Sequence, residues 1–140
     1  FLTTISRNAQ MVVARYGHGS LRRPHAPGLV HIGDAAHRAS PQLGQGANMA
    51  LLDALALAHA LRGPPEDALD DYAAMRRWHV RAYQGISAAF TPMYQSGSRC
   101  LPVLRDRLLA PCSTLPGVRG FLTRLVAGRM IPPLAGTNAP

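Results

Sequence analysis

Asp34 and the glycine-rich segment Gly44-Gln45-Gly46 are the residues whose types and spacing could bind a ligand. Asp34 offers a short, fixed hydrogen-bond acceptor, which suits a sugar-like or polyol hydroxyl and would repel a phosphate. The first amides of a helix have no partners within the helix and lie at its positive end. If a helix starts near Gly46, its uncovered backbone could receive an anion or an electron-rich carbonyl. A ligand with both a polyol and an electron-rich ring edge would match both features.

A purely structural interpretation accounts for the same residues one by one. Asp and Gly are common in turns, so Asp34 could simply cap the turn of a strand–turn–helix unit. Taken singly, the residues leave both interpretations open.

A strand and a helix must position these residues. Leu29 to Ile32 is a short aliphatic run after Pro27-Gly28, which predicts a buried strand. Gly33 would then allow a close backbone approach. Asp34 would project from the carboxyl end of the strand, where ligands collect in open α/β sheets.

A long helix is predicted from about Gln45, and Gly63-Pro64-Pro65 ends it. One face repeats with helical spacing, and the other faces are also apolar, so we expect the helix to be buried nearly all round. The apolar positions are Ala47, Ala50, Leu51, Ala54, Leu55, Ala58 and Leu61 on the first face, and Met49, Leu52, Ala56 and Leu57 on the others.

The whole string, about a quarter of the chain, is more specific than its parts. It comprises Gly33-Asp34-Ala35-Ala36-His37, then Pro41, Gly44-Gln45-Gly46, Asn48, Asp53-Ala54 and Leu57-Ala58. It closely resembles the second flavin-binding motif of the FAD-dependent aromatic hydroxylases, the flavoprotein monooxygenases of the para-hydroxybenzoate hydroxylase type. Leu52 departs from the family, which often has an acidic residue there, but this leaves the flavin contacts untouched.

The resemblance implies a role for each matched position. Asp34 would accept a hydrogen bond from a ribityl hydroxyl of FAD, and the loop from Pro41 to Gly46 would pass the isoalloxazine edge. The amides of Gly46 to Asn48 would face the pyrimidine oxygen, where reduced flavin carries negative charge. The cofactor-binding residues expected on this basis are Gly33, Asp34, Pro41, Gly44, Gln45, Gly46, Ala47 and Asn48.

The resemblance also implies a reaction. The parent enzyme would use NAD(P)H and O₂ to hydroxylate an aromatic or similar electron-rich substrate, with the flavin supplying the difficult step. No residue is assigned a catalytic role, and no role of any kind is assigned to His37. The alternatives are a related FAD-dependent reductase or halogenase, and a non-catalytic helical interaction fragment.

The expected fold is an α/β fragment, the C-terminal part of a glutathione-reductase-like FAD/NAD(P)-binding fold, mostly helical after a short strand pair. A strand–glycine turn–helix unit for the ADP part of FAD is missing, because neither Gly17-His18-Gly19 nor Gly44 to Gly46 fits its fingerprint. The chain begins at Phe1, so we expect a missing N-terminal portion of the same protein. The chain is expected to have three divisions. Residues 1–28 would be a remnant of a substrate-side sheet and loop, residues 29–63 the FAD motif, and residues 64–140 a helical region.

A second helix is predicted after Pro64-Pro65, limited by Thr91-Pro92. Acidic residues crowd its first turns and arginines follow, as the helix dipole favours. Its expected buried residues are Leu69, Tyr72, Ala73, Val80, Tyr83 and Ile86. Upstream of the motif, Gln10 to Tyr16 predicts a further strand.

Two amphipathic segments, residues 99–110 and 117–130, follow the second helix. Such segments usually pack one apolar face on a core. A basic surface that touches a membrane or another subunit is the alternative.

Composition argues against several other classes of function. The net charge of +8 comes from fifteen arginines and no lysine, scattered along the chain without a nucleic-acid reader motif, so nucleic-acid binding is not expected. The histidines at positions 18, 25, 31 and 37 lack the spacing of a zinc site, and no metal is expected. Cys100 and Cys112 predict free thiols, and no apolar run reaches the length of a membrane span. A cytoplasmic location is expected.

Overall fold

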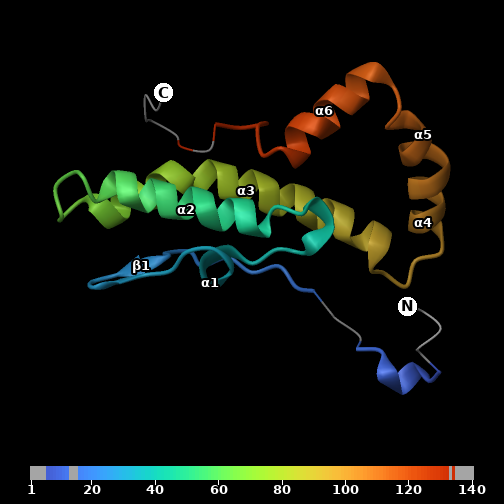
Figure 1. Ribbon diagram of the computed structural model, residues 1–140, viewed down its shortest axis with the longest axis horizontal. Helices are drawn as coiled ribbons and strands as arrows, with labels where there is room; N and C mark the ends of the chain where they lie inside the picture. Colours follow the sequence, from blue (N-terminus) through green and yellow to red (C-terminus); the bar gives the residue numbers. More distant parts are fainter. Residues whose placement is uncertain (1–5, 13–15, 133, 135–140) are drawn as a thin grey trace.

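Two long helices form the centre of the molecule. The computed structural model describes residues 6–12, 16–132 and 134. Helices α2 (Gly46–Ala60) and α3 (Ala68–Tyr94) run side by side as an antiparallel hairpin (Figure 1). The segment that precedes them, with β1 (His25–Ala26), β2 (Leu29–Val30), α1 (Asp34–His37) and η3 (Pro41–Leu43), runs along one side of this pair.

The strand pair is shorter and more exposed than predicted. β1 and β2 pair antiparallel, with His25 opposite Val30 and Ala26 opposite Leu29, around a turn at Gly28 with φ +73°. The prediction of a buried strand from Leu29 to Ile32 is wrong in length and burial, because β2 ends at Val30 and both Leu29 and Ile32 are exposed. Within the described residues the sheet contains only these two strands, so β2 has a single neighbour and one unpaired edge.

Helix α2 has the predicted bounds to within a few residues but not the predicted burial. Met49, Asp53, Ala56 and Ala60 are buried. The side chain of Leu51 is 71% exposed and that of Leu55 is 56% exposed, so the prediction of burial nearly all round is wrong. The described part of the chain covers only part of the helix surface.

Helix α3 contributes to both apolar cores. One core joins residues of α2 and the start of α3, and its members are Ala56, Ala60, Ala68, Tyr72, Met75 and Leu134. The other core joins the middle of α3 to η3 and the C-terminal helix, and its members are Leu43, Met49, Val80, Tyr83 and Leu125. The predicted buried positions are confirmed as buried or half-buried. The predicted end at Thr91-Pro92 is slightly early, because a proline near the last turn removes only one helix hydrogen bond and the helix continues to Tyr94.

The first residues do not form the predicted strand. Gln10 ends a single turn, η2 (Asn8–Gln10), and Met11 and Val12 that follow are exposed and not in a strand. The rest of that prediction, residues 13–15, lies outside the described residues.

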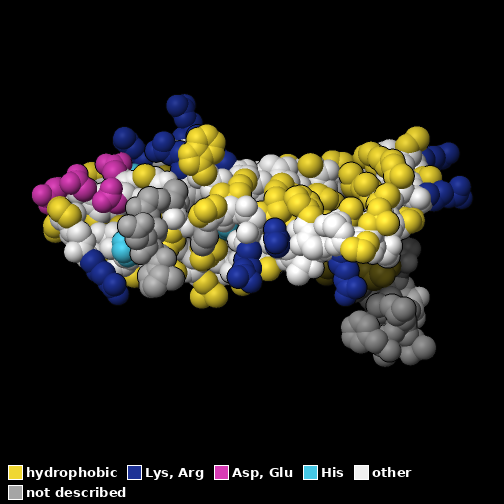
Figure 2. All heavy atoms as spheres, turned by 90° about the horizontal axis from the view of Figure 1, so that it is seen from above, with side chains coloured by type: hydrophobic (Ala, Val, Ile, Leu, Met, Phe, Trp, Pro, Cys, Tyr) yellow, Lys and Arg dark blue, Asp and Glu magenta, His cyan; other side chains and the backbone are white. Residues whose placement is uncertain are grey.

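The C-terminal part forms a helical arm, defined here as residues 99–126. It contains α4 (Cys100–Leu104), η4 (Arg105–Leu109), α5 (Ala110–Cys112) and α6 (Pro116–Val126). Both predicted segments are thus helical, but the second ends at Val126 and not at residue 130. α4 and α5 extend away from the hairpin and α6 turns back towards it (Figure 1). Figure 2 shows hydrophobic side chains gathered at this end, and Leu108, Leu115 and Phe121 are exposed there. None of the described helices combines the length and hydropathy of a membrane-crossing segment.

Candidate functional site

A cavity of about 380 Å³ lies where the predicted acid meets the start of α2. Its walls come from α1, η3, the first turns of α2 and the middle of α3. The lining residues are Tyr16, Asp34, His37, Ala39, Ser40, Pro41, Leu43, Gly44, Gln45, Gly46, Met49, Tyr83, Gln84 and Ser87. Five predicted binding residues are thus brought together around one space, whereas Gly33, Ala47 and Asn48 lie outside its lining.

Asp34 faces the start of α2 across this cavity. It is the first residue of α1 and is exposed. A Cβ atom placed on Gly46 would lie 4.0 Å from Asp34 Oδ1, so the acid is close to the helix end. Gly46 itself places no side chain between the acid and the helix backbone.

The backbone at the N-terminus of α2 carries no side-chain cap within the described residues. Gly44 has φ +62°, a left-handed conformation that favours glycine, and its N–H donates to Pro41 O at 2.9 Å. The turn therefore places Gly46 at the opening of the helix, where the first amides are oriented outwards.

The side chains of Gln45 and Asn48 serve packing. Asn48 Nδ2 donates to Gln45 Oε1 at 2.8 Å, and Gln45 Nε2 donates to the carbonyl of Val126 at the end of α6. Gly128, with φ +71°, passes so close that a Cβ atom there would lie 2.5 Å from Asn48 Nδ2. These side-chain amides fasten the C-terminal segment, and the backbone is what this part of α2 offers a ligand.

Gly33 is fixed by its backbone geometry. Its φ is +57°, and a Cβ atom there would lie 3.1 Å from the Cβ of Ala50 on α2. A side chain would therefore be strained in two ways, by conformation and by contact.

A buried ion network lies directly behind the cavity. Asp53 is fully buried and accepts three hydrogen bonds, from the Gly33 N–H at 2.7 Å, His37 Nε2 at 2.6 Å and Arg76 Nε at 2.7 Å. Burial alone would raise the pKa of Asp53, but the bonds from His37, Arg76 and Gly33 outweigh it and hold the pKa below its usual value. Asp53 is therefore a charged carboxylate paired with Arg76 inside the protein.

The network continues through His79 on α3. Arg76 Nη1 donates to His79 Nδ1 at 3.2 Å, so His79 Nε2 carries the ring proton and donates to Gly128 O at 3.4 Å. Burial and the nearby Arg76 charge lower the pKa of His79, which keeps the ring neutral. Burial, with the Asp53 charge, also raises the pKa of Tyr72 to about 12, and its hydroxyl donates to His31 O at 3.2 Å.

Sequence reasoning missed this network. It used Asp53 only as part of a motif, interpreted the arginines of the second helix only through the helix dipole and gave His37 no role. The available signal was an acid at position 53 within an otherwise apolar helix. A charge in such a position is buried only when it has a partner.

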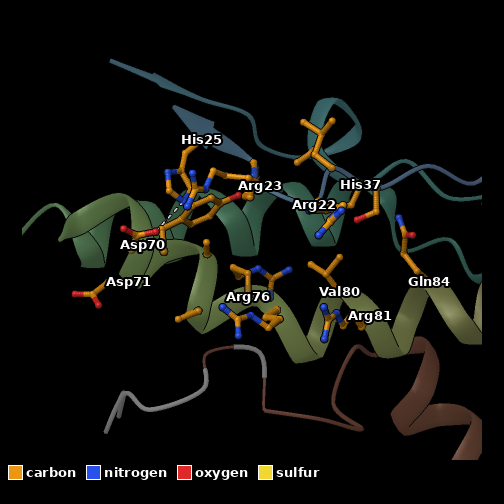
Figure 3. A pocket seen from close by; sticks show the side chains of 18 residues that line it. Arg22, Arg23, His25, His37, Asp70, Asp71, Arg76, Val80, Arg81 and Gln84 are labelled. Atoms are coloured by element: carbon orange, nitrogen blue, oxygen red, sulfur yellow. Dashed lines mark ion pairs between the residues drawn. The ribbon is translucent and has the colours of Figure 1, made fainter. Parts of the chain in front are cut away.

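A second, larger cavity of about 780 Å³ lies between residues 20–25, α1 and α3 (Figure 3). Arg22, Arg23 and Arg81 line it, together with an ion pair between His25 Nε2 and Asp70 Oδ1 at 3.2 Å. His37 and Gln84 line both cavities. Among the described residues no group of three potential ligands could hold a metal ion.

Comparisons with known proteins point to a common family. The model of a family described as "FAD binding domain" matches residues 4–85. A 3-(3-hydroxy-phenyl)propionate/3-hydroxycinnamic acid hydroxylase 2 of Burkholderia vietnamiensis is 35% identical over 99 residues, 67% of this chain and 18% of that protein. The 6-methylpretetramide 4-monooxygenase of Streptomyces rimosus is 34% identical over 116 residues, 79% of this chain and 28% of that protein. The chain thus spans less than a third of the length of these relatives.

Proposed function

Because the chain belongs to the FAD-binding domain family, we propose that it holds the ribityl chain and ring of FAD in a flavin-dependent monooxygenase that hydroxylates an aromatic substrate. The similar proteins are named hydroxylases and a monooxygenase, which favours oxygen insertion over a reductase or halogenase reaction. One observation carries the proposal for the site. The Asp34 carboxylate and the N-terminal backbone of α2 border the same cavity, with no side chain of Gly46 between them.

The residues around the cavity fit this cofactor. Its volume lies within the range of about 300 to 1,000 Å³ that is usual for small-molecule pockets. Asp34 would accept from a ribityl hydroxyl, and the loop from Pro41 to Gly46 would pass the isoalloxazine edge. The amides of Gly46 to Asn48 would face the pyrimidine edge, while Gly33 would act by placing Asp34.

The protein and the cofactor would divide the work. When bound, FAD supplies the redox chemistry. The residues of this chain would orient the ring and stabilise negative charge at its pyrimidine edge through preorganised helix amides. Hydroxylation by O₂ also requires two electrons from a reductant, for which we propose NAD(P)H.

The remaining features of the proposal concern the whole protein. Residues 29–63 would form the FAD motif of a glutathione-reductase-like fold, residues 1–28 the end of a substrate-side sheet and loop, and residues 64–140 a C-terminal helical region. The exposed side of α2 around Leu51 and Leu55 supports a covering by another portion of the protein. A cytoplasmic location is supported by the free thiols of Cys100 and Cys112.

Flavin titration tests the proposed site. Because this sequence contains no glycine fingerprint for the ADP part, riboflavin, FMN and FAD should bind with similar affinity. The fluorescence of the flavin should be quenched on binding. We expect weak binding, with dissociation constants on the order of 0.1 to 1 mM. Asp34→Ala should weaken riboflavin binding about tenfold, equivalent to about 1.4 kcal/mol.

Asp67→Ala is the matched control, because Asp67 is an exposed acid outside both cavities and should leave the affinity unchanged. The proposal fails if riboflavin shows no saturable quenching, or if the Asp34 and Asp67 variants bind it equally well.

A further inference from the structure

We infer that Asp53 is a positioning residue for the flavin site, because its buried carboxylate fixes the turn that carries Asp34 opposite the first amides of α2. The inference rests on the proposed function of the cavity. Asp53 lies on α2 itself, two helical turns after Gly46. The same rigid helix would therefore present its amides to the ligand and hold the acid that faces them.

The two hydrogen bonds to Asp53 Oδ2 bracket Asp34 along the chain. One comes from the N–H of Gly33, immediately before Asp34, at 2.7 Å. The other comes from Nε2 of His37, the last residue of α1, at 2.6 Å. The backbone of Asp34 cannot turn away from the cavity without breaking at least one of these bonds.

The other carboxylate oxygen prevents Asp53 from following such a movement. Oδ1 accepts from Arg76 Nε at 2.7 Å, and Arg76 in turn donates to His79 Nδ1 and approaches Met49 Sδ at 3.6 Å. Asp53 and Arg76 are both buried, so water cannot replace these partners without opening the core. The carboxylate is thus held between α2, α3 and the Asp34 turn.

A charged carboxylate is the group that this arrangement needs. Three donors, from Gly33, His37 and Arg76, converge on the two oxygens of Asp53. Asparagine has nearly the same shape but only one acceptor oxygen. The charged Arg76 would take that oxygen, because hydrogen bonds from a charged donor are the stronger ones, and the amide N–H would then face the donors of the turn. Asp53→Asn should therefore release the Asp34 turn.

A double-mutant cycle on riboflavin affinity separates positioning from a general loss of stability. Asp53→Asn should weaken riboflavin binding about tenfold. If Asp53 acts through Asp34, the Asp34→Ala, Asp53→Asn double variant should bind within about twofold of Asp34→Ala alone. Multiplied losses in the double variant would overturn the inference and leave the proposed flavin site intact.

Hydrogen exchange of the Gly33 amide provides a readout without any flavin. We expect the Gly33 N–H to be strongly protected in the wild type and in Asp67→Asn, and to exchange at least tenfold faster in Asp53→Asn. Unchanged protection in Asp53→Asn would contradict the inference. A different result would separate the two proposals. If Asp53→Asn loses the Gly33 protection as expected but the wild type binds no riboflavin, the proposed function is contradicted and the fixing of the turn is not.

A second pair of variants decides the question if circular dichroism shows that Asp53→Asn is unfolded. His37→Leu removes one bond to the turn and keeps the Asp53–Arg76 pair, whereas His37→Gln retains an N–H donor. We expect His37→Leu to weaken riboflavin binding and speed Gly33 exchange several-fold, and His37→Gln to restore most of both. Equal behaviour of the two variants would contradict the inference.

Discussion

Arg76 and Asp53 carry opposite charges in the interior, and each depends on the other. The Arg76 side chain is 3% exposed and that of Asp53 is fully buried. Removing one partner of such a pair leaves an uncompensated buried charge.

Arg76→Met should therefore lower the free energy of unfolding by about 3 to 5 kcal/mol, measured by urea denaturation. Arg77→Met is the matched control, because Arg77 is the next residue on α3 and is exposed, and it should change the free energy of unfolding by less than about 0.5 kcal/mol. Similar losses in the two variants would show that the pair is not formed.

The neutral His79 ring gives the fold a dependence on pH. Because its pKa is lowered in the folded state, the unfolded chain binds more protons than the folded one below the ordinary value of 6.5. The contribution of His79 to stability is thus complete above pH 6.5 and is lost as the pH falls below it. Asp53, whose pKa is also lowered, loses its contribution only at more acid pH, below its ordinary value of 3.8.

We expect the free energy of unfolding to fall between pH 7 and pH 5, and His79→Gln to reduce this slope. His59→Gln should keep it, because His59 is exposed. Thermal melts at a series of pH values measure the slope, and an identical slope in His79→Gln and the wild type would contradict the assignment.

At the scale of elements, the backbone conformation of Gly33 determines how β2 is connected to α1. Gly33→Ala should lower the free energy of unfolding by more than about 1 kcal/mol, because of the positive φ and the contact with Ala50. Gly85→Ala, inside α3 with open space around it, should instead raise it by about 0.5 to 1 kcal/mol. Chemical denaturation of both variants checks the opposite signs, and a stabilised Gly33→Ala would refute this view of the connection.

The long helices were predictable from sequence, and the strands only in part: a short strand pair before a mostly helical region was expected, and β2 begins at the predicted Leu29. Helical periodicity and proline breaks are local signals, which is why α2, α3 and the C-terminal arm occur where the sequence indicates. A strand needs a neighbour, and residues 11 and 12 have none in the described chain although their side chains are of strand type.

The candidate site was predictable only in part, for a similar reason. The glycine and acid motif predicted five residues that line one cavity. The Asp53 network depends on Arg76, which lies on another helix and 23 residues away. Local spacing cannot reveal such a pairing.

At the scale of the whole molecule, α6 packs back on the α2–α3 hairpin through Leu125. Leu125 is buried in the second core, and Tyr83 Oη donates to its carbonyl oxygen at 3.1 Å. Leu125→Ala should lower the free energy of unfolding by about 2 to 5 kcal/mol.

Phe121→Ala should cost clearly less, because Phe121 is 51% exposed on the same helix. Urea denaturation compares the two variants, and equal losses would show that α6 does not return as described. The exposed apolar face of the C-terminal arm, for which sequence analysis allowed a membrane or a second subunit, stays a prediction.

The most direct test of the central claim is a titration of the ¹⁵N-labelled chain with riboflavin, followed through its backbone amide signals. The claim is that the Asp34 carboxylate and the first amides of α2 contact one flavin. We predict that the amides of Asp34, Gly46, Ala47 and Asn48 shift together along one saturation curve. Shifts confined to the second cavity, at Arg22 and Arg81, or an Asp34 amide that does not move with the start of α2, would contradict it.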